Sequence, residues 1–545
     1  MIPCPTCAAG LRFDIASQKM VCDYCKNSFD PASLSDNSAT DDAKTEKYFD
    51  GYIYICPSCG AEIITTDKND AVGFCQYCGG ASMIFDKIRK EWRPDVIAPF
   101  KVTKEQCKEL YLKEIRKNPF IGGKYRNPQT IDGFRGIYMP YWSYHAELSG
   151  PFRVRAVSGR EHVGGNIYHI YHFDIDGVSD YRINGYSHDA SVSFDDDLSE
   201  GIAPFDSSGQ VRFIPAYLSG FYAETGDTDP QHYNDDITGE IVEDAQKLYK
   251  NDPAVTKVLS DRRLNLSESE SALPARIKSV SRAMNPVWFM SCRGKKDITY
   301  AAVNGQTGKV AADLPLSPVR ILIAALGISA VIFGLIFGAM SFLPSIKANM
   351  TLALCTLLAV TGMYFMQRSF NYTVDKNMSV LGKSKTGVLC GGLHKFATVI
   401  TFLSIFAIAV DGSYKGDIRF LGQIGALVGS IIIVIACAAQ FSDSRKIQKM
   451  KINQMSQLRV RITEEARWFS KSVLWLKIVM IASIAVSLAL VLLDPANNAV
   501  SYGACFLLAA ELFGLAIYHI SFQTRVAKRP LPQFKKEGAY YDRQQ

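Results

Sequence analysis

The alternation of apolar and polar positions divides the chain near residue 318. Before this point, short apolar runs alternate with charged and polar residues. After it, six apolar stretches each reach the roughly 20 residues that a helix needs to cross a bilayer. They run approximately over 319–343, 347–366, 388–410, 419–440, 473–493 and 498–522. The pattern therefore predicts an α-helical transmembrane bundle of six spans.

Basic residues between these stretches indicate an orientation. Lys and Arg concentrate in 367–387, in 441–472 and after 522, whereas 344–346 and 494–497 contain neither. Because basic loops stay on the cytoplasmic side of membrane proteins, we expect a cytoplasmic (inner) membrane protein with both termini in the cytoplasm. The chain opens without a basic segment followed by an apolar one, so we expect no cleavable signal peptide.

The connection 441–472 carries more basic residues than either of the other two segments. Its composition favours electrostatic binding to anionic lipid head groups. The alternative is that the segment only follows the general distribution of basic loops. Both interpretations are compatible with the sequence.

Glu511 is the only acidic residue deep inside any of the predicted spans. Ionisable side chains are costly inside a bilayer, which makes Glu511 a candidate functional residue. One interpretation is a proton or cation pathway. The other is a structural carboxyl group satisfied by a neighbouring helix, for example through Lys477 or Lys395.

Eight of the 14 cysteines form two CxxC…CxxC sets in the N-terminal half. The ligand candidates are Cys4, Cys7, Cys22 and Cys25 in the first set, and Cys56, Cys59, Cys75 and Cys78 in the second. Two residues between cysteines let one tight turn point both sulfur atoms at one ion, and four thiolates complete a closed tetrahedral shell. The spacing predicts two zinc ribbons that hold two structural Zn²⁺ ions, in a reducing compartment.

The segment between the ribbons and the apolar half mixes helical and extended patterns. A capped helix is predicted from Thr103, with apolar positions at Leu110, Leu112 and Ile115, and a second helix from Asn234. Strands are predicted over 135–148, 212–224 and 284–293. Asn304, Gly305 and Gly308 predict a hairpin turn, because such turns need positive φ angles. The pattern favours an α+β domain with aromatic residues in its core.

The complete prediction is a multidomain chain with two small β zinc ribbons, an α+β soluble domain and the six-span bundle. The expected boundaries are 1–30 for the first ribbon, 31–50 for a flexible linker, 51–90 for the second ribbon, 91–317 for the α+β cytoplasmic domain, 318–525 for the transmembrane domain and 526–545 for a basic cytoplasmic tail.

Charge is distributed unevenly between the two halves. Residues 1–317 contain 36 Lys/Arg and 43 Asp/Glu, so the formal net charge of +7 arises in the apolar half. Nucleic-acid binding proteins need positive charge where phosphates can reach it, so nucleic acid is an unfavoured partner and a cytoplasmic or membrane-peripheral protein is favoured. The sequence shows no GxSxG, HExxH or complete phosphate-loop pattern, and we predict that the protein is not an enzyme.

The double CPxC…CxYC pattern, the YMPYW and NPVWF segments, VNGQTGKV and the apolar C-terminal half resemble a family of bacterial double zinc-ribbon, multi-pass membrane proteins. Members are often mislabelled as the replication-restart helicase because of their ribbons, but helicase motifs are missing here. Some relatives resemble partners of flotillin-like and phage-shock membrane-stress proteins. The resemblance implies a membrane-anchored adaptor or scaffold that recruits cytoplasmic proteins. The alternatives are a zinc-ribbon-regulated transporter or channel, and a protein that tethers nucleic acid to the membrane.

Overall fold

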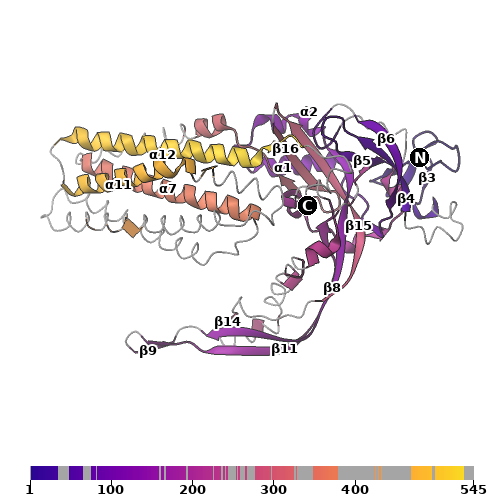
Figure 1. Cartoon of the computed structure of the whole chain (residues 1–545), viewed down its shortest axis with the longest axis horizontal. Helices are drawn as coiled ribbons and strands as arrows, with labels where there is room; N and C mark the ends of the chain where they lie inside the picture. Colours follow the sequence, from indigo (N-terminus) through magenta and orange to yellow (C-terminus); the bar gives the residue numbers. More distant parts are fainter. Residues whose placement is uncertain are drawn as a thin grey trace, which may run out of the picture. The chain divides into compact units, whose positions relative to one another are not determined.

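The structure is a computed structural model, and its elements are labelled in Figure 1. It describes residues 2–34, 48–65, 75–80, 83–158, 161–164, 167–191, 194, 196–224, 226, 228–234, 237–239, 241–242, 253, 256–257, 264–266, 276–295, 297–324, 327, 348–378, 424, 428, 431–432, 468–469, 471–493 and 497–532. Two compact units are present. Unit 1 comprises Met1–Asn118, Gly123–Asp313 and Pro530–Gln545, and unit 2 comprises Pro119–Gly122 and Leu314–Arg529.

Unit 1 begins with a small three-stranded antiparallel sheet that holds the first four cysteines. Its strands are β1 (Leu11–Asp14), β2 (Lys19–Cys22) and β3 (Ser28–Phe29), followed by the short 3-10 helix η1 (Ala32–Leu34). Alternation places Leu11 and Phe13 of β1 inside, against Met20 of β2. This sheet is the first ribbon.

A large mixed sheet forms the body of unit 1. Its strands follow the order β12-β7-β15-β8-β13-β5-β4-β6. Their bounds are β4 (Tyr48–Ile55), β5 (Glu62–Thr65), β6 (Ile84–Trp92), β7 (Val96–Ile97), β8 (Arg135–Ser158), β12 (Val211–Arg212), β13 (Tyr222–Ala223) and β15 (Arg276–Arg293). Strands β4 and β5 belong to the second ribbon, so this ribbon is continuous with the sheet.

Further strands extend the sheet from β8 and β15. Strands β11 (His172–Asp189) and β14 (Leu264–Leu266) pair with β8, while β16 (Asp297–Asn304) pairs with β15 and with β17 (Val310–Ala312). Strands β9 (Glu161–Gly164) and β10 (Ile167–His169) pair with each other. The long strands β8 and β11 run side by side as a ribbon (Figure 1). The predicted strands over 135–148 and 284–293 are confirmed.

The turn between β16 and β17 confirms the predicted hairpin. Asn304 accepts hydrogen bonds from the backbone N–H groups of Gln306 and Thr307 through its side-chain oxygen, and Gly308 has a φ of 77°. Gly305 is needed for a different reason than the one expected, because a Cβ there would lie 2.6 Å from the ring of Phe100.

The strand predicted over 212–224 is wrong in its centre. Residues Pro215–Leu218 form the 3-10 helix η5, because Pro215 has no N–H for a sheet ladder and suits the first position of a helix. The predicted helix from Asn234 lies largely outside the described residues.

Unit 2 contains three long helices, α7 (Ala348–Met378), α11 (Leu474–Leu493) and α12 (Asn498–Ala527). Helices α7 and α12 run parallel, as two contacts seven residues apart on each helix show. Gly362 lies against Leu512, and Ser369 is 3.0 Å from His519, so residue numbers increase in the same direction along both helices. Helix α11 runs antiparallel to α12. The short strand β18 (Arg529–Pro530) follows α12.

The prediction of a six-span bundle is wrong. In the described part of the chain, one helix, Asn498–Ala527, is long and apolar enough to cross a membrane, and a shorter apolar helix covers Trp475–Val491. The predicted spans 388–410 and 419–440, and most of 319–343, lie outside the described residues. Most of the described chain is instead an α+β fold built on sheets.

The stretch 347–366 shows why apolar content alone was insufficient. It lies in α7, where Leu352, Val360 and Tyr364 are buried in the core between the three helices. Helix α7 then continues through polar residues to Met378. Apolar side chains that pack against neighbouring helices give the same sequence pattern as side chains that face lipid.

The remaining helices of unit 1 lie beside the sheet. They are α1 (Lys104–Arg116), η3 (Gly123–Arg126), α2 (Pro128–Ile131), α3 (Asp196–Ile202), η4 (Ser207–Gly209), η5 and η6 (Pro230–Tyr233). Helix α1 confirms the predicted cap: Thr103 accepts a hydrogen bond from the Gln106 N–H, and the Gln106 side chain accepts one from the Thr103 N–H. Ile115 is buried as predicted, but Cys107 and Tyr111 complete the buried face, while Leu110 and Leu112 are only partly buried.

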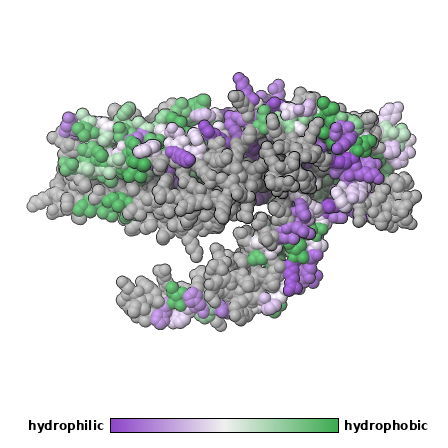
Figure 2. Space-filling view, in the orientation of Figure 1, coloured by the Kyte–Doolittle hydropathy of each residue, from purple (hydrophilic) through white to green (hydrophobic). Residues whose placement is uncertain are grey.

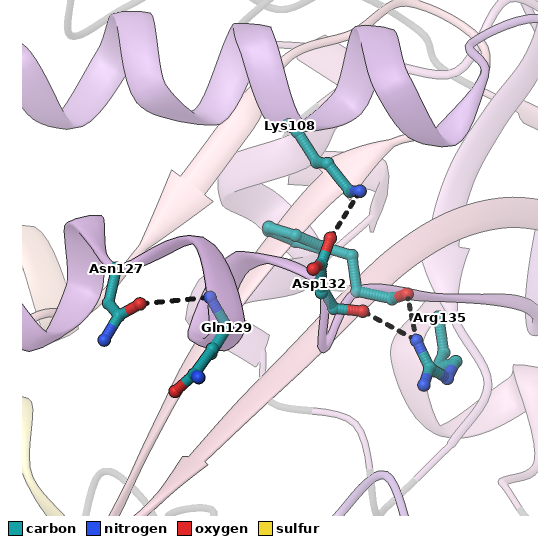
Figure 3. A network of polar contacts seen from close by, with 6 residues as sticks. Lys108, Asn127, Gln129, Asp132 and Arg135 are labelled. Carbon is teal, nitrogen blue, oxygen red and sulfur yellow. Dashed lines mark hydrogen bonds and ion pairs between the residues drawn. The ribbon is translucent and has the colours of Figure 1, made fainter.

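Polar contacts connect α1 to α2 (Figure 3). The Lys108 ammonium group lies 2.6 Å from a carboxylate oxygen of Asp132, and this hydrogen bond lowers the pKa of Asp132. Arg135 donates to the backbone oxygen of Asp132, and Asn127 caps α2 by accepting from the Gln129 N–H. These contacts are exposed, so their contribution to stability is small.

Replacing Thr103 by Ala should weaken the start of α1 by about 1 kcal/mol, because the Gln106 N–H loses its acceptor. The change should appear as faster hydrogen exchange at the amides of 105–107 in the full chain. Thr103→Ser keeps a hydroxyl acceptor and should exchange like the parent protein. Equal exchange in the Ala and Ser variants would show that the cap does not contribute.

Candidate metal centres

The eight cysteines converge on two points. The first centre is formed by Cys4, Cys7, Cys22 and Cys25, and the second centre by Cys56, Cys59, Cys75 and Cys78. Within each centre all four sulfur atoms lie within 4.8 Å of one another. Both predicted sets of ligands are therefore brought together by the fold.

Sulfur separations discriminate between a metal shell and disulfides. The Sγ atoms of Cys4 and Cys25 are 3.6 Å apart, and those of Cys56 and Cys78 are 3.5 Å apart. A disulfide would require about 2.05 Å. Tetrahedral zinc with bonds of about 2.3 Å sets its sulfur ligands about 3.8 Å apart. The geometry fits a four-thiolate metal site.

All four CxxC segments share one backbone turn. The first cysteine accepts a hydrogen bond at its carbonyl from the N–H four residues later, namely that of Ala8, Lys26, Gly60 or Gly79, at 2.8 to 2.9 Å. These four residues have positive φ angles of 63°, 61°, 78° and 66°. The left-handed residue closes the turn so that both sulfur atoms point to one side. Glycine adopts this conformation without a steric cost, and two of the four positions have it.

Hydrogen bonds to sulfur favour the thiolate form that binds metal. Burial raises the pKa of Cys4, but hydrogen bonds from the N–H groups of Thr6 and Cys7 help to outweigh this effect. The net result is a pKa lowered to about 6. The hydrogen bond with Cys59 is the largest of several effects that lower the pKa of Cys75 to about 6. Each centre thus contains a cysteine predisposed to lose its proton.

The two centres differ in their surroundings. Cys7 and Cys25 of the first centre are partly exposed, while all four cysteines of the second are buried. The first ribbon packs against η5: Ser219 donates a side-chain hydrogen bond to the Leu11 carbonyl at 2.8 Å and accepts one from the Phe13 N–H at its own carbonyl. The Gln18 side chain also donates to the Phe100 carbonyl at 2.7 Å, so the first ribbon is docked on η5 and on the segment before α1.

The second centre is part of the core of unit 1. Its cysteines share a buried cluster with Ile137 of β8 and Phe289 of β15. Within its last turn, the Tyr77 hydroxyl donates to the Glu224 carboxylate, and the Tyr77 carbonyl accepts from the Tyr300 hydroxyl at 2.8 Å. Sequence reasoning missed Glu224 and Tyr300, because they lie far along the chain and carry no local signal.

Four thiolates fill a tetrahedral shell, so neither centre keeps an open position for water or substrate. The donor set is consistent with zinc, and the arrangement suits a structural ion. Among the described residues, groups of ligands close enough to hold a metal occur at these two centres.

Glu511 lies on α12 and is buried against α11. Its Oε1 accepts a hydrogen bond from Ser483 at 2.7 Å, and within the described part its Oε2 has no hydrogen-bond partner. Lys477 donates to Gln367 of α7 rather than to Glu511. Lys395 and nearly all of the basic segment 441–472 lie outside the described residues.

Comparison with known proteins gives one informative likeness. Over 244 residues the chain is 25% identical to the uncharacterized protein YdjG of Bacillus subtilis (strain 168), covering 44% of this chain and 68% of that protein. No family model and no solved structure matches. The two four-cysteine centres agree with the resemblance to double zinc-ribbon proteins, but the comparisons do not establish the membrane-protein family.

Purified protein should contain two zinc ions per chain. Cys22→Ser should reduce this to one while unit 1 stays folded, because the first centre is partly exposed and lies outside the core cluster that contains the second centre. Cys75→Ser should also remove one ion but expose the core to proteolysis, because the second centre lies within it. Metal analysis combined with limited proteolysis measures both effects. A metal content near zero, or equal proteolysis of the two variants, would contradict this assignment.

Gly60→Ala should weaken metal binding at the second centre about tenfold, because a side chain in the left-handed conformation costs roughly 1–2 kcal/mol. Competition with a chromophoric chelator measures the affinity. Ala8→Gly at the corresponding turn of the first centre is the matched control and should not weaken binding. An unchanged affinity for Gly60→Ala would show that the turn does not constrain the sulfur positions.

Proposed function

We propose that this protein is a membrane-anchored zinc-ribbon adaptor. In this proposal, unit 1 binds a cytoplasmic or membrane-peripheral protein, two structural zinc ions maintain its shape, and α12 attaches it to the bilayer. The observation that carries the proposal is that the described part of the chain combines two four-cysteine centres with a helix long and apolar enough to cross a membrane.

The closed shells support a structural role for the metal. Catalytic zinc keeps one position for water or substrate, whereas four protein sulfur ligands leave none. Small ribbons of this kind depend on their metal for folding, since a segment this short buries little apolar surface. The metal therefore serves the shape of a binding surface.

The length and surface of α12 support membrane attachment. Its 30 residues span about 45 Å, enough for the roughly 30 Å hydrocarbon layer. Phe506 is 78% exposed on α12, and Trp475 is 75% exposed on α11. Figure 2 shows hydrophobic residues gathered on the described surface of these helices. Contiguous exposed apolar surface needs a lipid or protein cover.

Charge and cysteine chemistry support the choice of partner and compartment. The excess of Asp and Glu over Lys and Arg in residues 1–317 opposes the long-range attraction that nucleic-acid binders use. Eight thiolate ligands require a reducing environment, which favours the cytoplasmic side of the membrane. A protein partner on that side is the interpretation consistent with both.

The test uses the full chain, affinity-tagged and extracted from its native membranes in mild detergent. We expect a protein to co-purify with the parent chain and with Glu511→Gln, which leaves unit 1 unchanged. The same protein should be lost when Cys4 and Cys22 are both replaced by Ser, because the first ribbon then unfolds while the second centre keeps the core.

Two further measurements make the outcome decisive. The protein should stay with the membrane after carbonate extraction, and it should not bind labelled duplex or single-stranded nucleic acid tightly at physiological salt. Release of the protein by carbonate would contradict membrane anchoring through α12. Submicromolar nucleic-acid binding that weakens steeply with salt would replace the adaptor with a nucleic-acid tether.

A further inference from the structure

The two ribbons use the same CxYC segment in opposite ways. Tyr24 of Cys22-Asp23-Tyr24-Cys25 is 83% exposed, whereas Tyr77 of Cys75-Gln76-Tyr77-Cys78 is 2% exposed. Their backbone turns are the same, since each first cysteine accepts from the N–H four residues later and donates to the carbonyl five residues later. The difference lies in what covers the tyrosine.

The second ribbon shows the kind of surface that this turn fits. The Tyr77 hydroxyl donates to the buried carboxylate of Glu224, whose other oxygen accepts from Ser191 at 2.7 Å. The Tyr77 ring lies 6.0 Å from the ring of Phe289, measured between centroids. Tyr77 thus occupies a buried position where its hydroxyl donates to a carboxylate and its ring lies beside another aromatic ring.

The turn that carries Tyr24 is already held in a fixed shape. Lys26 N–H donates to the Cys22 carbonyl at 2.9 Å, and the Cys25 N–H donates to the Cys22 sulfur at 3.5 Å. An aromatic side chain on a rigid turn loses little conformational freedom on binding, which is the property of an interface anchor. Tyr24 is therefore presented in a form ready to bind.

Charge beside Tyr24 indicates the sign of the partner surface. Lys26 is exposed on the same turn, while Asp23 is 3.8 Å from Arg12 within the first ribbon. A carboxylate on a partner could accept from the Tyr24 hydroxyl and be attracted by the Lys26 ammonium group. This matches the acceptor that Glu224 supplies to Tyr77.

We propose that Tyr24 is the anchor by which the first ribbon docks onto its protein partner, and that the partner presents a carboxylate within an aromatic-lined pocket. The inference rests on the proposed adaptor function and specifies its contact. The first ribbon would then insert into another protein as the second ribbon inserts into its own chain.

The test places the photoreactive residue p-benzoylphenylalanine at position 24 of the full chain in native membranes. The matched control carries it at position 19, which is exposed on β2 of the same ribbon. We expect a cross-link to one protein from position 24 and not from position 19. The cross-linked peptide should contain an Asp or Glu close to aromatic residues.

Substitutions then measure the contact with the captured protein. Tyr24→Ala should weaken binding about tenfold or more, as for a typical anchor residue, and Tyr24→Phe should have an intermediate effect because it loses only the hydroxyl donor. Both variants should keep two zinc ions, which separates a lost contact from a lost fold.

The outcomes separate this inference from the adaptor function. A captured protein that binds Tyr24→Ala as well as the parent chain would overturn the role of Tyr24 and leave the adaptor intact. Equal cross-links from positions 19 and 24, or cross-links from position 24 only to lipid, nucleic acid or a second copy of the chain, would also overturn it. Absence of any captured protein would remove both proposals.

Discussion

Within unit 1, four sulfur atoms meet in the turns that connect β4 to β5 and precede β6, and these strands are hydrogen-bonded into the main sheet. Thiolates this close together repel one another unless a cation lies between them, so a bound metal would stabilise these turns and the strands that they join. The Tyr77–Glu224 hydrogen bond extends this dependence to β13 and its surroundings. A module that would fold alone in many proteins has here become part of a larger core.

Local chemistry explains which parts of the fold the sequence could predict. The Thr103–Gln106 cap and the turn after Asn304 depend on residues at most a few positions apart, and each set of four cysteines lies within one short segment of the chain. The Tyr77–Glu224 contact spans 147 residues, and no local pattern indicates it. The same limit hid the different environments of Tyr24 and Tyr77, since the two CxYC segments are equivalent in sequence and differ only in what the rest of the chain places beside them.

Apolar content was the least reliable predictor of membrane spans, because apolar residues occur both in helices packed inside a protein and in helices that face lipid. Leu352 and Val360 of α7 are buried between helices, whereas Phe506 of α12 is exposed. Close approach of α7 and α12 is aided by small residues such as Gly362, which lies against Leu512. Hydropathy describes a residue and not what surrounds it, so within the described part of the chain it predicted more spans than the structure contains. It did correctly mark α12 as apolar enough to cross a membrane.

The unequal burial of the two centres implies unequal rates of metal exchange. Water and small chelators can reach the first centre at Cys7 and Cys25, but the second becomes accessible only when the core around β8 and β15 opens. When zinc becomes scarce, the peripheral ion should leave first, and the protein should lose its exposed ribbon while its main fold persists. The order in which the two ions depart is thus set by the sheet rather than by the ligands, which are the same in both centres.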